Sequence, residues 1–388
     1  MSEALAAARR LAPRFAARAE AYDRTGSFPV DDFADLRTAG LFGLMVPGRL
    51  GGTGAGFTDY AAVAYELARG NGATALVFNM HASVTGALAA VTEDLASALG
   101  IPDEALAARD RFLKAAADGA WYAVAMSERG VGSRLSKLST MYEVVPGGFH
   151  IKGSKTFVSG AGHPDGYLVA ARSAAAPDNV SQFLVPSTVE GLAVEETWDS
   201  LGMRATSSHD LHLDIVVPAH SLLGGVEGLA LIVAQLAPHW LVASYAAVYV
   251  GVAQAAVDAA VEHLTKRGLA QLPAVRARVG RADAAVVAAK LAVEEAARRV
   301  DAAPGEPETN RWVWRAKLLA GTTAMDVAAS MLEASGTSAS RRGHPLERLY
   351  RDARCGSLQP ATSDVCADWL GIAALGGDPD LDGSAPRW

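Results

Sequence analysis

The sequence predicts an α+β protein in which helices come first, short strands occupy the middle and helices return at the end. Apolar residues recur every three or four positions from 58 to 113 and again from 228 to 375, as they do along one face of a helix. Between 121 and 173, apolar and polar residues alternate in short runs separated by turn clusters, which is typical of antiparallel strands in a barrel or a sandwich. At 388 residues the chain is long enough for two or three folding units with a shared interior.

The changes of pattern divide the chain into four parts. We expect an N-terminal helical domain (1–118), a β domain (119–225), a C-terminal helical domain (226–375) and an extended tail rich in Gly, Asp and Pro (376–388). In the β domain the expected strands cover 121–126, 149–152, 167–171, 183–186, 194–196 and 211–217.

Composition excludes several classes of function. The chain carries 35 Lys and Arg against 42 Asp and Glu, a net charge of −7, so a broad nucleic-acid surface is not expected. No apolar run reaches the length of a membrane span, and no signal peptide is visible at residues 1–20. Cys355 and Cys366 lie eleven positions apart without a CxxC pattern, which predicts reduced thiols in a cytoplasmic protein.

Two features of the N-terminal region invite a functional interpretation. The glycine-rich segment 51–56 suggests a phosphate loop, but no long strand precedes it, so we interpret it as the loop before a helix. The segment 74–91 is apolar on nearly every side, which predicts a helix buried in a bundle. His81 lies within it and needs a partner, either as a satisfied core residue or as a catalytic one.

In the β domain, His209 and His212 lack a third ligand, so no metal site is predicted.

Two motifs in the β domain carry a family resemblance. The sequence SERGVGS occupies 127–133 and GSKTFVS occupies 153–159. Together with LGMR at 201–204 they resemble the middle domain of the acyl-CoA dehydrogenase superfamily, and the resemblance extends from about residue 5 to 375. It implies a helical domain, a β-barrel domain and a C-terminal four-helix bundle that carries the interface of a homodimer or homotetramer.

The resemblance also implies a bound flavin and assigns residues to it. The cofactor would be FAD, with FMN or diffusible reduced flavin as alternatives. Ser133 falls where the family contacts the substrate. The positions matching the family's flavin contacts are Met126, Ser127, Phe157, Ser159 and Thr362.

The catalytic base of the family is missing. Dehydrogenation of an acyl thioester requires a carboxylate that takes the α-proton while flavin N5 takes the β-hydride. The family's usual glutamate position is Pro360 in this chain, and the alternative position falls near Leu241. Asp364 and His239 are the remaining candidates, and each is better explained as an ordinary polar residue at a helix end.

Other departures resemble a second branch of the superfamily, the flavin-dependent monooxygenases of the dibenzothiophene-desulfurising type. The loops that hold the FAD pyrophosphate are poorly matched at 266–270 and 334–340. In that branch reduced flavin comes from a separate reductase and forms a C4a-hydroperoxide, for which Ser159 and His81 would supply hydrogen bonds. The branch also has a histidine where this chain has Gln359.

The sequence therefore leaves three hypotheses. By a small margin we favour a flavin-dependent oxidoreductase that oxidises an acyl thioester, bound to CoA or a carrier protein, and passes electrons to a partner. The alternatives are a two-component monooxygenase, which would need a flavin reductase, and a non-catalytic acyl-binding member of the superfamily.

Overall fold

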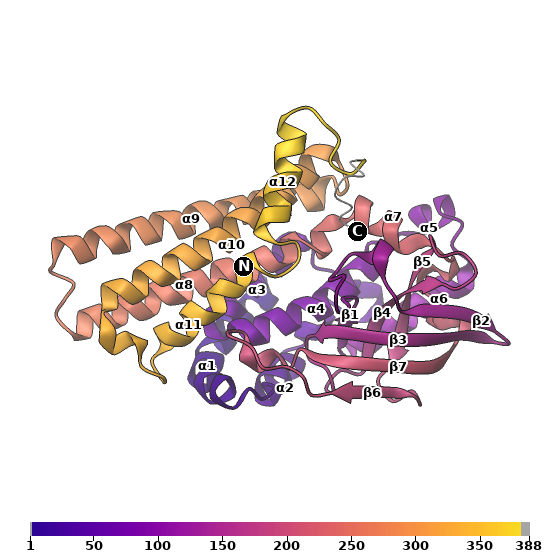
Figure 1. Cartoon of the computed structure of the whole chain (residues 1–388), viewed down its shortest axis with the longest axis horizontal. Helices are drawn as coiled ribbons and strands as arrows, with labels where there is room; N and C mark the ends of the chain where they lie inside the picture. The colour runs from indigo at the N-terminus through magenta and orange to yellow at the C-terminus, as the bar shows by residue number, and fades with distance from the viewer. Residues whose placement is uncertain (1, 382–388) are drawn as a thin grey trace.

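The computed structural model describes residues 2–381. Along the chain a helical region precedes a curled sheet and another follows it, and in space the sheet lies at the right and the long C-terminal helices extend to the left (Figure 1). The α+β expectation is confirmed. The N-terminal helices are α1 (Glu3–Thr25), α2 (Val30–Thr38), α3 (Phe57–Gly70), α4 (Gly72–Ala89), α5 (Glu93–Ala98) and α6 (Asp103–Ala117).

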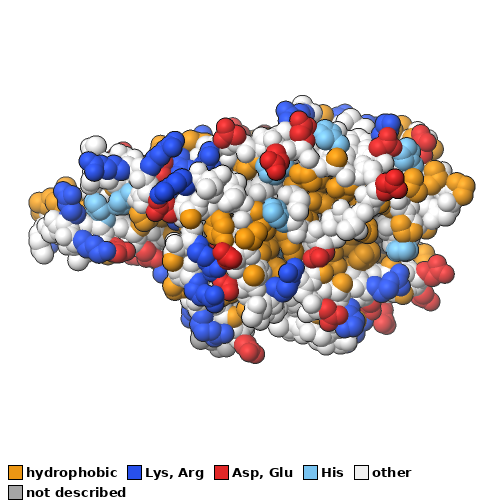
Figure 2. Space-filling model, turned by 90° about the horizontal axis from the view of Figure 1, so that it is seen from below, with side chains coloured by type: hydrophobic (Ala, Val, Ile, Leu, Met, Phe, Trp, Pro, Cys, Tyr) orange, Lys and Arg blue, Asp and Glu red, His pale blue; other side chains and the backbone are white. Residues whose placement is uncertain are grey.

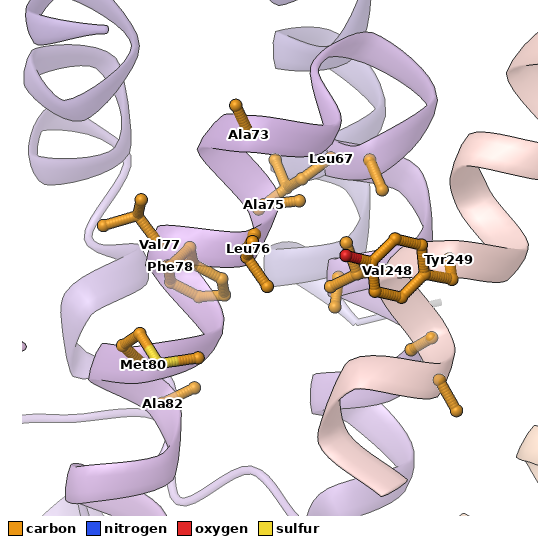
Figure 3. Packing of buried hydrophobic residues seen from close by; sticks show 14 of the residues in the cluster. Leu67, Ala73, Ala75, Leu76, Val77, Phe78, Met80, Ala82, Val248 and Tyr249 are labelled. Carbon is orange, nitrogen blue, oxygen red and sulfur yellow. The ribbon is translucent and has the colours of Figure 1, made fainter. Parts of the chain in front are cut away.

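Helix α4 is the centre of the N-terminal region, as its all-round apolar pattern predicts. Almost all of its residues are buried, from Gly72 to Leu88. It packs against α3 and against the long C-terminal helix α8 (Ala243–Lys266). Figure 3 shows Leu76 of α4 on the side that faces Val248 and Tyr249 of α8. The N-terminal helices and the C-terminal bundle therefore share one hydrophobic core.

The central sheet is a half-barrel with a mixed strand order. Its strands are β1 (Tyr122–Ala125), β2 (Met141–Val145), β3 (Gly148–Val158), β4 (Gly166–Ser173), β5 (Val180–Pro186), β6 (Leu192–Glu195) and β7 (His209–Pro218). The order is β1-β4-β2-β3-β7-β6, with β5 paired to β4. Neighbours β2/β3, β3/β7, β4/β5 and β6/β7 are antiparallel as expected.

The expected antiparallel barrel is a half-barrel that is not antiparallel throughout, because β4 runs parallel to both β1 and β2. Alternation of side chains identifies a strand but does not encode its direction, so this pairing was not visible in the sequence. The β2–β3 hairpin lies between β1 and β4 in the chain, and this allows β4 to return beside β1 in the same direction.

The C-terminal region contains three long helices and several shorter ones. The helices are α7 (Leu229–Leu236), α8, α9 (Pro273–Ala302), α10 (Pro307–Ser335), α11 (Pro345–Arg354) and α12 (Ser363–Ala374). Helices α8, α9 and α10 pack against one another, and α11 and α12 both pack on α10 (Figure 1).

Two expectations about chain segments need correction. The stretch Pro238–Lys266 is long and apolar enough to cross a membrane, so the expectation that no run reaches that length was wrong. Its most apolar part is 83% buried in the bundle, which explains its composition. The expected extended tail lies partly outside the described residues, at 382–388, and its described part is turned, with the Leu381 N–H donating to Asp378 O.

The glycine-rich segment 51–56 forms the loop before α3, as expected. A Cβ atom at Gly52 would lie 2.2 Å from the carbonyl oxygen of Val46, so backbone packing requires the absence of a side chain there. Packing inside the chain therefore explains this glycine without a phosphate ligand.

Candidate functional site

The end of strand β3 presents an aromatic ring away from the sheet. The pairing of β3 with β7 shifts register between Lys155 and Val158, and at this bulge Phe157 adopts a φ of 56°. Bulky residues rarely adopt such a backbone, and strain of this kind clusters at functional sites. The Phe157 ring is 62% exposed and meets Trp198 edge-on, with ring centroids 6.1 Å apart. It is thus available as one wall for a flat ligand.

A second strained turn lies against the end of β3. Met203 and Ser207 also have positive φ, at 53° and 44°, and with Phe157 they are the non-glycine residues with positive φ in the described chain. The N–H of Gly160 donates to Thr206 O at 2.7 Å, which joins the two turns. The motif LGMR at 201–204 and the motif GSKTFVS at 153–159 therefore lie next to each other in space.

Three hydroxyl groups connect these turns in a buried chain. Ser159 Oγ lies 2.9 Å from Ser208 Oγ, which lies 2.7 Å from Thr206 Oγ1. Thr206 then donates to the carbonyl oxygen of Met203 at 2.9 Å. The chain ends in a carbonyl acceptor, so its direction is fixed: Ser208 donates to Thr206, and Ser159 donates to Ser208. With its proton given to Ser208, Ser159 can offer a lone pair to a ligand.

The loop after β1, which contains Met126, Ser127 and Ser133, is fixed from below by a buried ion pair. Nζ of Lys155 lies 2.7 Å from Oε1 of Glu128. Burial raises the pKa of Glu128, but the attraction of Lys155 and hydrogen bonds from Lys155, Ser139 and Thr140 outweigh it and lower this pKa to about 2.

The same loop is also held by backbone contacts. The N–H of Thr156 donates to Ser127 O at 2.8 Å, which ties the loop to β3. Glu128 and Gly132 exchange backbone hydrogen bonds of 3.0 and 2.9 Å, which closes the loop on itself. The backbone around Ser127 is therefore rigid beside the strand that carries Phe157 and Ser159.

On the helical side, a buried lysine supports the segment that contains Pro360, the position to which the family resemblance assigns the base. Lys317 of α10 donates to the carbonyl oxygens of Gly356 at 2.9 Å, Gln359 at 3.2 Å and Ala361 at 2.9 Å. The side chain is 1% exposed, and burial lowers its pKa to about 8. Lys317 thus fixes the path of 356–361, which includes Pro360.

Position 359, where the monooxygenase branch has histidine, carries a polar contact to α8. The hydroxyl of Tyr249 donates to Gln359 Oε1 at 2.6 Å. Tyr249 is fully buried, and burial raises its pKa well above the usual value, so the phenol stays neutral. The Gln359 amide nitrogen keeps its donors for another partner.

The N-terminus of α12 has the features of an anion site. Thr362 caps this helix, its Oγ1 accepting the N–H of Val365 at 3.3 Å. The neighbouring Ser363 hydroxyl is buried and has no hydrogen-bond partner among the described residues. Backbone N–H groups at a helix start favour an anion, so a flavin phosphate would satisfy this hydroxyl.

A buried carboxylate joins the helical and sheet sides. Asp352 of α11 accepts the N–H of Met203 at 2.6 Å. Burial raises the pKa of Asp352, and the Arg348 charge and the Met203 N–H act against this rise. Since Met203 also accepts the hydrogen bond of Thr206, the position of α11 is transmitted to the hydroxyl chain that ends at Ser159.

His81 has all of its hydrogen bonds within the protein. Its Nε2 lies 2.8 Å from Phe42 O, and its Nδ1 accepts the Tyr122 N–H at 3.1 Å. The ring is 1% exposed, and burial lowers its pKa to about 4, so it is neutral. Both nitrogens are therefore engaged by backbone, as in a satisfied core histidine, and its predicted role toward the flavin stays a prediction.

The two substitute bases considered from the sequence differ in their surroundings. Asp364 is exposed in the first turn of α12. His239 is buried, its Nδ1 has no partner among the described residues, and burial lowers its pKa to about 4. No hydrogen bond or ion pair joins either side chain to Phe157, Ser159 or Gln359 among the described residues. The structure thus brings Ser127, Phe157 and Ser159 together and leaves the base unreplaced.

Sequence reasoning missed Lys317, Tyr249 and Asp352 as parts of this site. A signal for Lys317 was present, because it is a lone cation on an otherwise apolar helix face between Val313 and Ala320. The partner atoms of all three are distant in sequence, so their roles could not be read from it.

The residues present fit a flavin. Phe157 would supply a ring wall, Ser127 and Ser159 would supply polar groups, and the Ser363 hydroxyl at the start of α12 has no partner among the described residues. The face seen from below in Figure 2 shows hydrophobic side chains gathered right of centre between charged ones.

Three family models cover most of the chain. They are the N-terminal domain (residues 2–97), the middle domain (123–216) and the C-terminal domain (243–362) of acyl-CoA dehydrogenase. L-evernosamine nitrososynthase of Micromonospora sp. is 32% identical, over 95% of this chain and 89% of its own. The 3-(aryl)acrylate reductase of Clostridium sporogenes is 27% identical, over 89% and 90%.

Solved structures give the same picture. KijD3, in complex with FMN and dTDP-3-amino-2,3,6-trideoxy-4-keto-3-methyl-D-glucose, superposes with a TM-score of 0.84 at 28% identity and covers 97% of this chain and 95% of its own. FMN-bound TdsC from Paenibacillus sp. has a TM-score of 0.85 at 24% identity over 97% and 98%, which shows a shared fold.

Proposed function

Since the chain belongs to the acyl-CoA dehydrogenase family and is a flavin-dependent oxidoreductase, we propose that it works as a monooxygenase supplied with reduced flavin by a separate reductase. When bound, reduced flavin supplies two electrons, and O2 gives one oxygen atom to the substrate and the other to water.

The observation that carries this proposal is the missing carboxylate. Position 360 is proline, held in place by Lys317 contacts on both sides of it, and position 241 is leucine. The buried Asp352 already accepts the Met203 N–H. Without a base, an acyl thioester would keep its α-proton, whereas oxygen transfer needs no such group.

The residues of the proposed site can bind a flavin, but they include no base that would remove a proton from the substrate. Phe157 would flank the flavin ring, Ser127 and Ser159 would bind its polar edge, and Thr362 and Ser363 would face its phosphate. FMN suits these groups, because the loops that hold the rest of FAD are poorly matched at 266–270 and 334–340.

An amine-bearing sugar nucleotide is the substrate class to test first. A nitrososynthase relative is 32% identical, and KijD3 was solved with an amino-sugar nucleotide. The Tyr249–Gln359 pair would put polar atoms on the helical side of the proposed site. These atoms suit a polar substrate, whereas a wholly apolar wall would favour an acyl chain.

The decisive experiment supplies FMN, a flavin reductase, NADH and O2, with dTDP-linked amino sugars as substrates. We expect substrate-dependent oxygen incorporation, followed by mass spectrometry with ¹⁸O₂. Ser159→Ala should lower the rate at least tenfold, while Ser97→Ala, on exposed α5, should not change it. Oxidation that proceeds equally without O2 would rule out a monooxygenase.

Acyl-thioester dehydrogenation is the second candidate, favoured by the family models and by Ser133 at the family's substrate position. Its test is anaerobic. Bleaching of the oxidised flavin by an acyl thioester at a catalytic rate would establish it and would require an unrecognised base.

We also propose that the chain assembles as a homodimer or homotetramer in the cytoplasm. The supporting observation is exposed apolar residues on the long bundle helices, namely Val287, Leu291 and Leu319. Light scattering of purified protein would test the assembly, and a monomer at micromolar concentration would contradict it.

A further inference from the structure

A pocket of about 390 Å³ lies between the end of α1, the turn at 200–204 and the segment that starts α11. It is a different place from the flavin site, since Phe157, Ser159 and Thr362 do not line it. Five of its thirteen lining residues are arginines: Arg24, Arg204, Arg342, Arg348 and Arg351.

The acidic residues of this pocket are already neutralised. Arg351 holds Asp23 at 2.6 Å and Glu347 at 2.7 Å. Glu20 pairs with Arg24 one helical turn away. The carboxylates therefore anchor two of the arginines and do not leave unpaired negative charge facing the cavity.

Two arginines retain donor capacity. Arg348 is 9% exposed, and the one polar contact found for it in the described chain is long, with Nη1 3.5 Å from Asp352 Oδ2. Arg342 is exposed and forms no ion pair with another described residue. A guanidinium has five N–H donors, and the Asp352 contact of Arg348 engages one of its nitrogens. A ligand rich in oxygen atoms would satisfy them.

We propose that this pocket binds the phosphoryl group of a small molecule, with Arg342 and Arg348 as its principal ligands. The planar guanidinium matches a phosphate with two parallel hydrogen bonds, and Arg342 adds a positive charge that forms no ion pair with another described residue. The cavity has room for a group attached to the phosphate. Since Arg351 and Arg204 also bond the backbone at 200–201, the phosphate would lie directly behind the turn that carries Met203.

The test is calorimetric titration of the FMN-saturated protein with inorganic phosphate and with pyrophosphate at constant ionic strength. Saturation with FMN fills the anion site at α12, so binding there does not interfere. We expect saturable binding of pyrophosphate with a dissociation constant below 1 mM, roughly the affinity of a few charge-assisted hydrogen bonds.

Matched variants locate the ligand. Arg342→Ala should weaken binding about tenfold, and Arg348→Lys, which keeps the charge but loses the fork, should weaken it by a similar factor. Arg341→Ala removes an adjacent exposed arginine outside the pocket and should leave binding unchanged. The proposal is overturned if neither anion binds up to 10 mM, or if Ser363→Ala abolishes binding while Arg342→Ala does not.

Discussion

Nζ of Lys155 lies 2.7 Å from Oε1 of Glu128, and both side chains are almost completely buried beneath the loop that carries Ser127. The pair comes from the two family motifs, so it joins them physically. A buried ion pair costs most when one partner is removed, because the other charge is then left without compensation.

We therefore expect Glu128→Gln or Lys155→Met alone to lower the free energy of unfolding by about 3–5 kcal/mol. The double variant should recover part of that loss. Urea unfolding measures it, with Lys152→Met, at an exposed ion pair with Asp214, as a control that costs less than about 1 kcal/mol. Additive losses in the double variant would contradict the coupling.

Phe157→Asn should separate stability from function. Asparagine tolerates a φ of 56° better than phenylalanine, and the lost ring is largely exposed, so we expect a gain of about 1 kcal/mol in unfolding free energy. The flavin should bind more weakly, as measured by quenching of FMN fluorescence. Val144→Asn, at an exposed valine of β2, is the control and should not raise the free energy of unfolding.

Lys317→Met should change the dependence of stability on pH. Burial lowers the pKa of Lys317 from 10.5 to about 8, so between these values the unfolded chain holds a proton that the folded chain has lost. Stability contributed by this group therefore rises from pH 8 to 10.5. Unfolding of wild type and variant at pH 7.5 and 10 should show the wild type gaining roughly 2 kcal/mol relative to the variant.

The same variant should disturb the site. Methionine leaves three carbonyl groups of 356–361 without their donor, and each buried one costs about 1–3 kcal/mol. We expect kcat to fall more than KM rises. An unchanged kcat would show that the path of this segment does not matter for the reaction.

Acid should destabilise the protein through its buried histidines. Burial lowers the pKa of His81 from 6.5 to about 4, so the unfolded chain binds more protons in this window and stability falls as pH drops from 6.5 to 4. His81→Gln should remove roughly 3 kcal/mol of that fall. His239 titrates in the same window, so the double variant should flatten the curve further. Equal acid sensitivity in wild type and His81→Gln would refute this assignment.

Local sequence patterns predicted most helices and strands, but they did not predict how the strands pair. The all-round apolar sequence of α4 predicted a buried helix, and alternation located β1, β4 and β7. Strand β2 was not predicted, although it forms a hairpin with β3 across the turn at Pro146 and Gly147. Parallel pairing of β4 with β1 had no local signature, because strand direction depends on the connection.

The residues of the candidate site also fall into two groups, those that the sequence identified and those that it did not. The motifs at 127–133 and 153–159 identified Ser127, Phe157 and Ser159, since these residues act from positions close in sequence. Lys317 contacts carbonyls about forty positions away, and His81 receives its partners from Phe42 and Tyr122. Such contacts are decided by packing between distant segments, which one sequence does not display.

Gly202 limits how far the C-terminal bundle and the sheet domain can shift relative to each other when neighbouring residues are substituted. A Cβ atom there would lie 2.2 Å from the carbonyl oxygen of Arg351, so main chain touches main chain where the bundle meets the sheet. The spacing at this seam is set by peptide groups, which no exchange of neighbouring side chains alters. Substitutions around this contact can therefore change the chemistry of the nearby surfaces while the distance between α11 and the loop before β7 stays constant.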